Sequence, residues 1–151
     1  MDHHCPWVAN CIGFYNYKYF LNMLFYASIT SALIVVTAYP VFLAVLANDN
    51  VNNSLAYYIV TAWILTLVFC FVIVSFYLFH LYLVYNQYTT IEFCEKRSND
   101  KKFKQKSPYD RGCCANFQTV YGSNCLLWCF PCNRNLEGEG LHFEVRDDLK
   151  P

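Results

Sequence analysis

Charged residues are scarce across the first two thirds of this chain. Only 15% of its 151 residues are charged, whereas a soluble domain has about 25%. Asp, Glu, Lys and Arg are absent between Lys18 and Asp49, and again between Asp49 and Glu92. Each gap exceeds the roughly 20 apolar residues that a helix needs to cross a bilayer. The sequence therefore argues against a soluble protein and predicts two transmembrane helices, over residues 19–47 and 56–85.

The absence of charge within the two predicted helices also narrows the function. Ion and substrate pathways through membranes are usually marked by ionisable groups inside the helices. Neither predicted helix contains Asp, Glu, Lys or Arg, so a small channel or transporter hairpin is disfavoured. The lipid bilayer is an expected partner, and nucleic acid is not.

Basic residues are missing from the short connection between the predicted helices, residues 48–55. Lys18 precedes the first helix, and the other ten Lys and Arg residues follow residue 95. Positive charge stays on the cytoplasmic side of a membrane protein. Both termini are therefore expected in the cytoplasm and the connection in the lumen or outside the cell, with residues 86–151 as a cytosolic tail.

The nine cysteines of the chain would suggest a disulfide-bonded scaffold in an exported protein. In the predicted topology, however, Cys70 lies within a helix and the other eight lie on the reducing, cytoplasmic side. Cytosolic cysteines more often act as metal ligands or nucleophiles than as disulfide partners. Some of these cysteines are therefore expected to carry chemistry.

A thiol, two imidazoles and a carboxylate open the chain in the sequence Asp2-His3-His4-Cys5. The thiolate is the nucleophilic form of cysteine, and an ordinary thiol is only a few per cent ionised at neutral pH, so a reactive cysteine needs a base beside it. His3 can take the proton of Cys5, and Asp2 can hold the imidazole in the required tautomer. The tetrapeptide thus has the logic of a nucleophile–base–acid triad compressed into one turn.

The same segment, residues 1–18, contains candidate zinc ligands. His4 is expected to point away from His3, and with Cys11 it offers the neutral imidazole and thiolate that zinc binds. A structural zinc site needs four ligands, and the chain offers no other convincing pair nearby. Spacing alone leaves an alternative open, in which both histidines and both cysteines of this segment bind zinc and no catalysis takes place.

Three motifs of this chain match a known family. Residues 2–20 (DHHCPWVANCIGFYNYKYF) closely resemble the signature of the DHHC family of protein S-acyltransferases, or palmitoyltransferases. Residues 89–92 (TTIE) match the family's Thr-Thr-x-Glu motif just after the second predicted helix, and residues 116–122 (NFQTVYG) resemble its C-terminal motif. The resemblance covers about residues 1–122.

The resemblance implies an all-α membrane protein. Members of the family have four transmembrane helices, so this chain would supply the C-terminal helical hairpin, with cytosolic termini and with residues 1–18 as the last part of a Cys-rich zinc domain. The first two helices and six of the eight expected zinc ligands are absent from the sequence. We therefore expect a truncated product, or a gene model that begins too late, and a polypeptide that is inactive alone.

The resemblance also implies a role for each motif residue. Cys5 would accept a fatty acyl group from acyl-CoA, with His3 as general base and Asp2 as its orienting partner. His4 and Cys11 would bind zinc, and Trp7 and Phe20 would contact the incoming acyl chain. Thr90 would approach Asp2 from the motif that it forms with Thr89 and Glu92, and Glu92 would make a structural hydrogen bond. Asn116 and Tyr121 would brace the tail against the helices.

The implied activity is that of a protein-cysteine S-palmitoyltransferase. An acyl-Cys5 intermediate would form from palmitoyl-CoA and pass its acyl group to protein substrates with cytosolic juxtamembrane cysteines, in a two-step ping-pong scheme. Zinc would be structural and acyl-CoA the co-substrate, in a multi-pass protein of the Golgi, the ER or the plasma membrane. The alternative is a non-catalytic, membrane-anchored zinc-binding adaptor.

Overall fold

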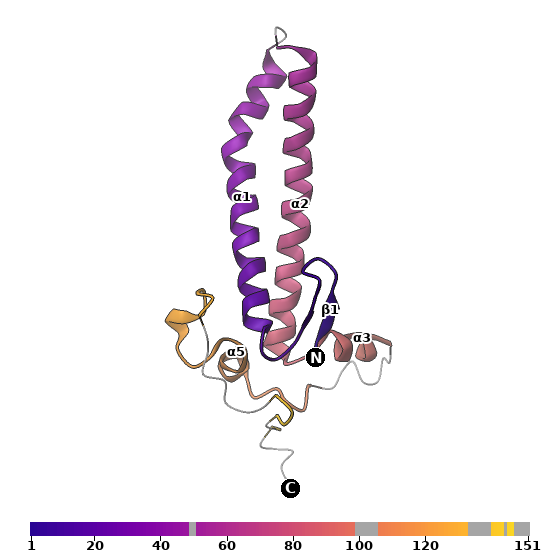
Figure 1. Ribbon diagram of the computed structural model, residues 1–151, viewed down its shortest axis with the longest axis vertical. Coiled ribbons are helices and arrows are strands. Elements are labelled where there is room, and N and C mark those ends of the chain that lie inside the picture. The colour runs from indigo at the N-terminus through magenta and orange to yellow at the C-terminus, as the bar shows by residue number, and fades with distance from the viewer. Residues whose placement is uncertain (49–50, 99–105, 133–139, 144, 147–151) are drawn as a thin grey trace. The chain divides into compact units, whose positions relative to one another are not determined.

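The computed structural model describes residues 1–48, 51–98, 106–132, 140–143 and 145–146. The chain divides into two compact units, one formed by residues 1–22 with 79–151 and the other by residues 23–78. The described elements are, in chain order, β1 (His3–Cys5), β2 (Asn10–Ile12), α1 (Tyr17–Ala47), α2 (Asn53–Asn86), α3 (Thr90–Ser98), α5 (Cys113–Tyr121) and the 3-10 turn η1 (Cys125–Leu127) (Figure 1).

The first residues of the chain form a small antiparallel hairpin of β1 and β2, in which His4 lies opposite Cys11. The side chain of Asn16 holds the end of this hairpin. Its Nδ2 donates to the carbonyl of Cys11, and its Oδ1 accepts from the backbone N–H of Gly13, both at 2.8 Å. The backbone N–H of Gly13 and the carbonyl of Cys11, which have no helical partner, are thus paired to a side chain.

This hairpin corrects two expectations for residues 1–18. The fold is mostly helical but not all-α, because β1 and β2 form a two-stranded sheet. The Asp2-His3-His4-Cys5 motif is not compressed into one turn, because its last three residues form an extended strand. Neighbouring side chains of a strand point to opposite faces, and this alternation decides how the motif is used.

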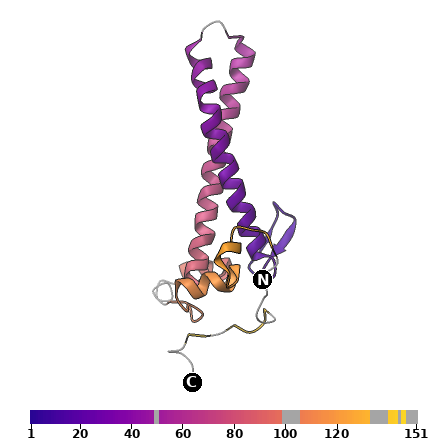
Figure 2. The ribbon, with the colours of Figure 1, turned by 90° about the vertical axis from the view of Figure 1, so that its left-hand side faces the viewer.

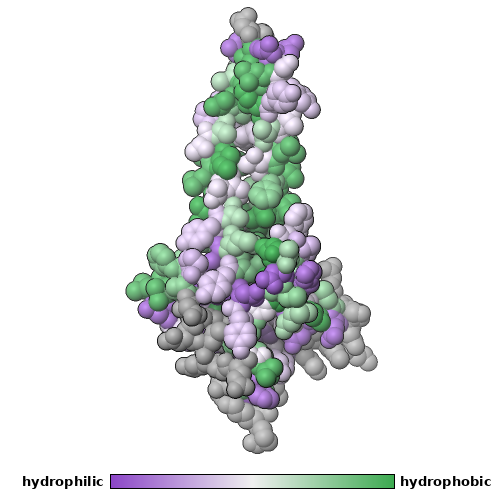
Figure 3. Space-filling view, viewed as in Figure 1, coloured by the Kyte–Doolittle hydropathy of each residue, from purple (hydrophilic) through white to green (hydrophobic). Residues whose placement is uncertain are grey.

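The unit of residues 23–78 consists of the apolar middle parts of α1 and α2. Both helices are long and apolar enough to cross a membrane, and large side chains such as Val36 and Phe71 are exposed on them. Figure 3 shows apolar surface along this part of the chain. A helix that is apolar on all sides is typical of a membrane span. Within the pair, Trp63 donates to the carbonyl of Val35 at 3.1 Å and stacks on Phe42.

The helices run somewhat beyond the ranges predicted from charge. α1 begins two residues before the predicted start and ends at the predicted residue, and α2 extends three residues earlier and one residue later than predicted. Residues 49–50 of the predicted connection and residues 99–105 of the basic part of the tail lie outside the described residues. The side of the membrane on which each end lies stays a prediction.

The apolar core of the other unit joins the ends of the long helices to α5. Leu21 of α1, Val84 of α2, and Val120 and Tyr121 of α5 are buried together, and Tyr17, Phe117 and Trp128 pack against them. Figure 2 shows α5 beside the ends of α1 and α2. This core fixes the start of α1, which leads out of the hairpin, against the end of α2, which leads into α3.

Candidate active site

Strand β1 separates the chemistry of the opening motif onto two faces. His3 and Cys5 are two residues apart on the strand, so their side chains share one face. His4 points to the other face, where its cross-strand partner is Cys11. We call these the His3 face and the His4 face. The strand therefore brings the predicted base and nucleophile together, and separately brings the two predicted zinc ligands together.

Asp2 and His3 form the shortest polar contact of the site. Asp2 Oδ2 lies 2.6 Å from His3 Nδ1, and Asp2 is buried. Because a carboxylate accepts a hydrogen bond, Nδ1 carries the proton and Nε2 is left as the basic nitrogen of the neutral ring. The structure thus pairs the residue predicted to orient the base with the residue predicted to be the base, and their catalytic roles stay predictions.

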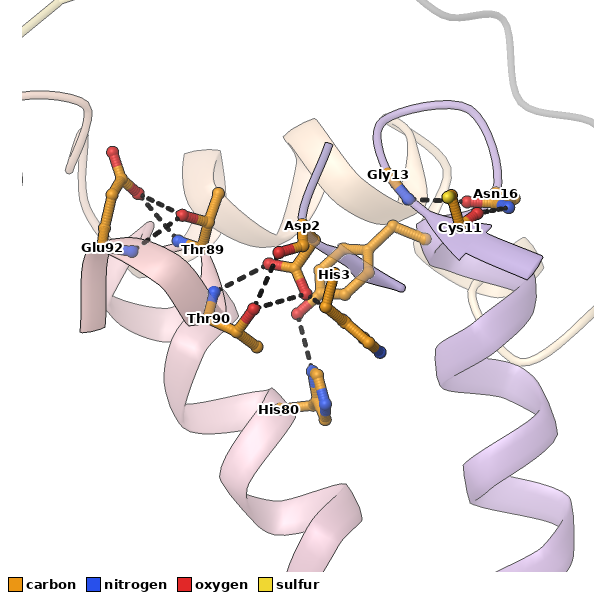
Figure 4. Close-up of polar contacts among 10 residues, drawn as sticks. Asp2, His3, Cys11, Gly13, Asn16, His80, Thr89, Thr90 and Glu92 are labelled. Atoms are coloured by element: carbon orange, nitrogen blue, oxygen red, sulfur yellow. Dashed lines mark hydrogen bonds and ion pairs between the residues drawn. The ribbon is translucent and has the colours of Figure 1, made fainter. Parts of the chain in front are cut away.

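The beginning of α3 holds the Asp2 carboxylate. The backbone N–H of Thr90 donates to Asp2 Oδ1 at 2.8 Å, and Thr90 Oγ1 lies 2.9 Å from the carbonyl oxygen of Asp2 and 3.3 Å from Oδ2. The partial positive charge at a helix N-terminus stabilises a carboxylate there. Figure 4 shows Thr90 facing Asp2 from α3. The predicted approach of Thr90 to Asp2 is present, and it joins the hairpin to the end of α2.

Thr89 and Glu92 cap α3 in a reciprocal arrangement. Glu92 Oε2 accepts from the backbone N–H of Thr89 at 2.8 Å and lies 3.0 Å from its Oγ1, while Thr89 Oγ1 accepts from the backbone N–H of Glu92 at 3.2 Å. This is a capping box, which satisfies donors that the first helical turn leaves unpaired. Glu92 makes the structural hydrogen bonds expected of it, and the motif fixes the helix end that holds Asp2.

An aromatic wall lines the His3 face. Phe20 is 4% exposed, and its ring meets the rings of His3 and His80 edge-on, at centroid distances of 5.4 and 5.0 Å. Cys5, at the end of β1, is also buried. Trp7 lies in the connection between the strands and is 92% exposed. Of the two residues predicted to contact an acyl chain, only Phe20 packs against the base, and acyl binding by either stays a prediction.

The His4 face has the spacing of two neighbouring zinc ligands. Cys11 Sγ lies 3.5 Å from His4 Nδ1. With zinc bonds of about 2.0 Å to nitrogen and about 2.3 Å to sulfur, a tetrahedral centre places the two donor atoms about 3.5 Å apart. The two residues therefore fit half of a four-ligand site. Within the described ranges no group of three or more His, Cys, Asp or Glu residues has an arrangement that could hold a metal ion.

Asn116 of α5 ties the tail to the end of α2. Its Nδ2 donates to the carbonyl of Tyr85 at 2.7 Å and to Asp110 Oδ1 at 2.8 Å, and its Oδ1 accepts from the backbone N–H of Arg111 at 3.0 Å. The carbonyl of Tyr85 belongs to the last turn of α2, whose carbonyls have no helical donor. Together with the buried ring of Tyr121, Asn116 makes the bracing contacts predicted for the tail.

A cleft of about 290 Å³ opens beside Asp2. Its walls include Phe14, Tyr109 and Phe143, and Glu92 also contributes to the lining. Phe143 packs edge-on against Phe14 and Tyr109, at centroid distances of 5.7 and 6.1 Å. Asp2 therefore borders a mostly apolar space whose lining includes several aromatic rings.

Family comparison agrees with this arrangement of the motifs. The family model described as DHHC palmitoyltransferase matches residues 1–97. This chain belongs to that family. DHHC palmitoyltransferases are membrane proteins, and the two long apolar helices fit that class. The matched range contains both faces of β1, both long helices and the capping box of α3.

Curated relatives extend the similarity across nearly the whole DHHC chain. It is 32% identical over 173 residues to palmitoyltransferase PFA3 of Debaryomyces hansenii, covering 99% of this chain and 43% of that protein. It is 34% identical over 157 residues to probable protein S-acyltransferase 14 of Arabidopsis thaliana, covering 99% and 50%. It is 31% identical over 147 residues to palmitoyltransferase ZDHHC15 of Rattus norvegicus, covering 97% and 43%. The chain spans about half the length of these relatives.

Two residues of this DHHC site were not singled out from the sequence as parts of the machinery. His80, expected to be an ordinary satisfied histidine of the second helix, is fully buried beside His3. Tyr17, within the opening motif, bonds to His80. The presence of a histidine in an otherwise uncharged predicted span was the one signal that pointed to this region.

Proposed function

We propose that this chain supplies the nucleophile and the base of a protein S-palmitoyltransferase, which moves an acyl group from palmitoyl-CoA to cysteines of protein substrates. The observation that carries the proposal is the 2.6 Å contact between Asp2 Oδ2 and His3 Nδ1, on a strand whose same face bears the buried Cys5. An oriented imidazole next to a buried thiol is the arrangement that activates a cysteine nucleophile.

In the first step, His3 Nε2 takes the proton of the Cys5 thiol. The thiolate attacks the carbonyl carbon of the palmitoyl thioester, so a carbon–sulfur bond forms to Cys5. The carbon–sulfur bond to CoA then breaks, and the CoA sulfur leaves with the proton held by His3. The negative charge of Asp2 stabilises the imidazolium that exists between these two proton transfers.

In the second step, the acyl group passes from Cys5 to a protein cysteine. His3 takes the proton of the substrate thiol, and the substrate thiolate attacks the carbonyl carbon of acyl-Cys5. A new thioester forms, the bond to Cys5 breaks, and the Cys5 sulfur regains a proton from His3. No oxidant or reductant takes part, and the enzyme returns to its starting state.

Zinc fits the His4 face as a structural ion. His4 and Cys11 would hold it together with two further ligands, and when bound it supplies a cross-link between β1 and β2. Its role would be to hold the strand that carries His3 and Cys5, rather than to activate a water molecule. The donor pair and its 3.5 Å spacing support this assignment.

The membrane arrangement follows from the same proposal. Both termini lie in the cytoplasm, where acyl-CoA reaches Cys5, and the connection between α1 and α2 faces the lumen or the cell exterior. The four-helix family fold would surround the exposed apolar faces of α1 and α2, in the Golgi, the ER or the plasma membrane. Digestion of sealed microsomes with protease should cut tags at both ends and spare a tag placed between the helices.

The central test is acyl labelling of the full-length protein. We expect a palmitoyl label that hydroxylamine releases, located on Cys5, and transfer of that label to a co-expressed substrate. Cys5→Ser should abolish both signals, whereas Cys94→Ser, the matched change at an exposed cysteine of α3, should leave them intact. Equal substrate acylation by the Cys5→Ser protein would contradict the proposal and favour a zinc-binding adaptor.

A further inference from the structure

A second buried imidazole lies against the proposed base. The ring of His80, on α2, is 5.7 Å from the ring of His3 between centroids, with an interplanar angle of 36°. The side chain of His80 is fully buried. Figure 4 shows His80 pointing from α2 toward the Asp2–His3 pair. The proposed mechanism assigns no proton transfer to His80, so its place beside the base calls for a separate explanation.

Tyr17 fixes the orientation of this second imidazole. Its hydroxyl lies 3.0 Å from His80 Nδ1, and its ring stacks on Phe20 at a centroid distance of 6.3 Å. Phe20 in turn meets the edges of His3 and His80. Tyr17 and Phe20 come from the first turn of α1, His80 from α2 and His3 from β1. The four rings form one packed group, within which Tyr17 and His80 are joined by a hydrogen bond.

We propose that Tyr17 and His80 are positioning residues for the base: their hydrogen bond fixes the His80 ring as a wall that keeps His3 Nε2 aimed at the thiol of Cys5. This inference rests on the proposed function and deepens it. Asp2 holds only one edge of the His3 ring, through Nδ1. The flanking rings of Phe20 and His80 supply the lateral limits, and a catalytic group works only when its neighbours lock its rotamer.

Charged and titratable groups lie close to this pair. Asp2 and His3 act electrostatically on His80, and Asp2 and Tyr121 act on Tyr17. Asp2 is already bonded to His3 and to Thr90. The Tyr17 hydroxyl is therefore placed to orient His80 without competing for the carboxylate that orients His3.

Three substitutions separate the hydrogen bond from the packing. Tyr17→Phe removes the hydroxyl and keeps the ring that stacks on Phe20. His80→Phe keeps a ring beside His3 and removes the hydrogen bond, whereas His80→Asn keeps a polar atom near the position of Nδ1. Tyr19→Phe, at an exposed tyrosine of the same helix, is the matched control. Gel filtration in detergent checks that each variant of the full-length protein is folded.

The first readout is single-turnover acylation of Cys5 by palmitoyl-CoA. We expect Tyr17→Phe and His80→Phe each to lower the maximal rate by about three- to tenfold, which is what one hydrogen bond is worth. The half-saturating concentration of palmitoyl-CoA should stay within about twofold, because the pair does not bind substrate. His80→Asn, which keeps a polar atom but has no ring, should lose at least as much rate as His80→Phe, and Tyr19→Phe should match the wild type.

The second readout is a double-mutant cycle with the base. Alkylation of Cys5 by iodoacetamide needs no acyl donor, so its rate can be measured in a His3→Ala background. Tyr17→Phe should slow alkylation about three- to tenfold when His3 is present and have no effect when His3 is absent, because the pair acts through that ring. An equal loss in both backgrounds, or no loss in either, would overturn the inference.

The two readouts also keep this inference apart from the proposed function. If the wild-type protein never acylates Cys5 but the alkylation rates still couple Tyr17 to His3, the acyl-transfer proposal fails and the positioning role stands. If Cys5 acylates normally in folded Tyr17→Phe protein, the positioning role fails and the acyl-transfer proposal stands.

Discussion

The two faces of β1 differ in the contacts that hold their side chains, although the residues of both faces alternate along one strand of three residues. The His3 face is anchored by distant parts of the chain: Asp2 is held by α3, and His3 lies against Phe20 and His80. The His4 face is closed locally, by the cross-strand neighbour Cys11. Long-range contacts thus orient the proposed base, and a local pair presents the proposed zinc ligands.

This difference bears on the alternative hypothesis that both histidines and both cysteines of residues 1–18 bind one zinc ion. His3 Nδ1 is bonded to Asp2, and the side chain of His3 points away from that of His4 because strand neighbours alternate. Cys11 Sγ and His4 Nδ1, in contrast, lie at the spacing of ligands on one metal. The extended strand therefore favours two separate sites, with the Cys5 sulfur kept apart from the metal that would bind it.

The largest expected effect comes from removing the base on the His3 face. His3→Ala should lower the rate of Cys5 acylation by about 10²- to 10⁴-fold, the usual contribution of general base catalysis. The zinc content of the purified protein, measured by elemental analysis, should not change. A His3→Ala protein that loses its zinc would show that the two faces are not independent.

Asp2→Asn tests how the base is oriented. The amide cannot accept from His3 Nδ1 through its nitrogen and no longer stabilises an imidazolium, so we expect a rate loss of about 10²-fold or more in the same labelling assay. Circular dichroism should show unchanged helix content. A rate within a few fold of the wild type would mean that the 2.6 Å contact is not used in catalysis.

His4→Ala is the matched change on the other face. We expect the affinity for zinc to fall more than about 100-fold, because removing a residue that only supports a metal ligand already lowers affinity by roughly 10- to 100-fold. The thermal midpoint in detergent should fall as well. Acylation should fall only in proportion to the folded fraction, measured on the same sample. Retention of full zinc content by His4→Ala protein would remove His4 from the site.

The smallest effect is expected at the capping box that supports the His3 face from α3. Glu92→Ala removes the acceptor of the Thr89 N–H and should cost about 1 kcal/mol in the stability of the helix start. The acylation rate should fall only severalfold, because Thr90 still donates to Asp2. Glu95→Ala, at an exposed position of the same helix, is the control, and equal behaviour of the two variants would contradict the capping role.

The sequence predicted the helices well because their signal is local. Two long runs without charge mark α1 and α2, whereas the approach of Thr90 to Asp2 was expected only because the motif resembles that of a known family. The strand at His3–Cys5 was not predicted. A strand is recognised in a sequence by alternation of apolar and polar residues, and three residues that include two histidines do not show it. The hairpin is closed instead by polar contacts of the Asn16 side chain with Gly13 and Cys11, and such contacts leave no hydrophobic pattern in the sequence.

The sequence also did not predict contacts that depend on the side of a helix on which a residue lies. Lys18 was taken only as a charge that flanks the first span, but it is buried, and its Nζ donates to the carbonyl of Leu127 at 3.0 Å. His80 was placed on the second helix, but no pattern fixed which way its side chain points. The contact between Lys18 and Leu127 and the contact between His80 and Tyr17 each join segments that are distant in sequence, so only the folded chain defines them.

Asn116 has a genetic consequence. Its side-chain amide donates to the carbonyl of Tyr85 in the final turn of α2, the helix that also bears His80. Its backbone carbonyl accepts from Gln87 Nε2 at 2.9 Å. A premature stop codon shortly before this asparagine would leave every motif residue from Asp2 to Glu92 encoded, yet would strip the helix end of these partners. Nonsense alleles in the tail should therefore behave as loss-of-function alleles, although the tail carries none of the reacting atoms.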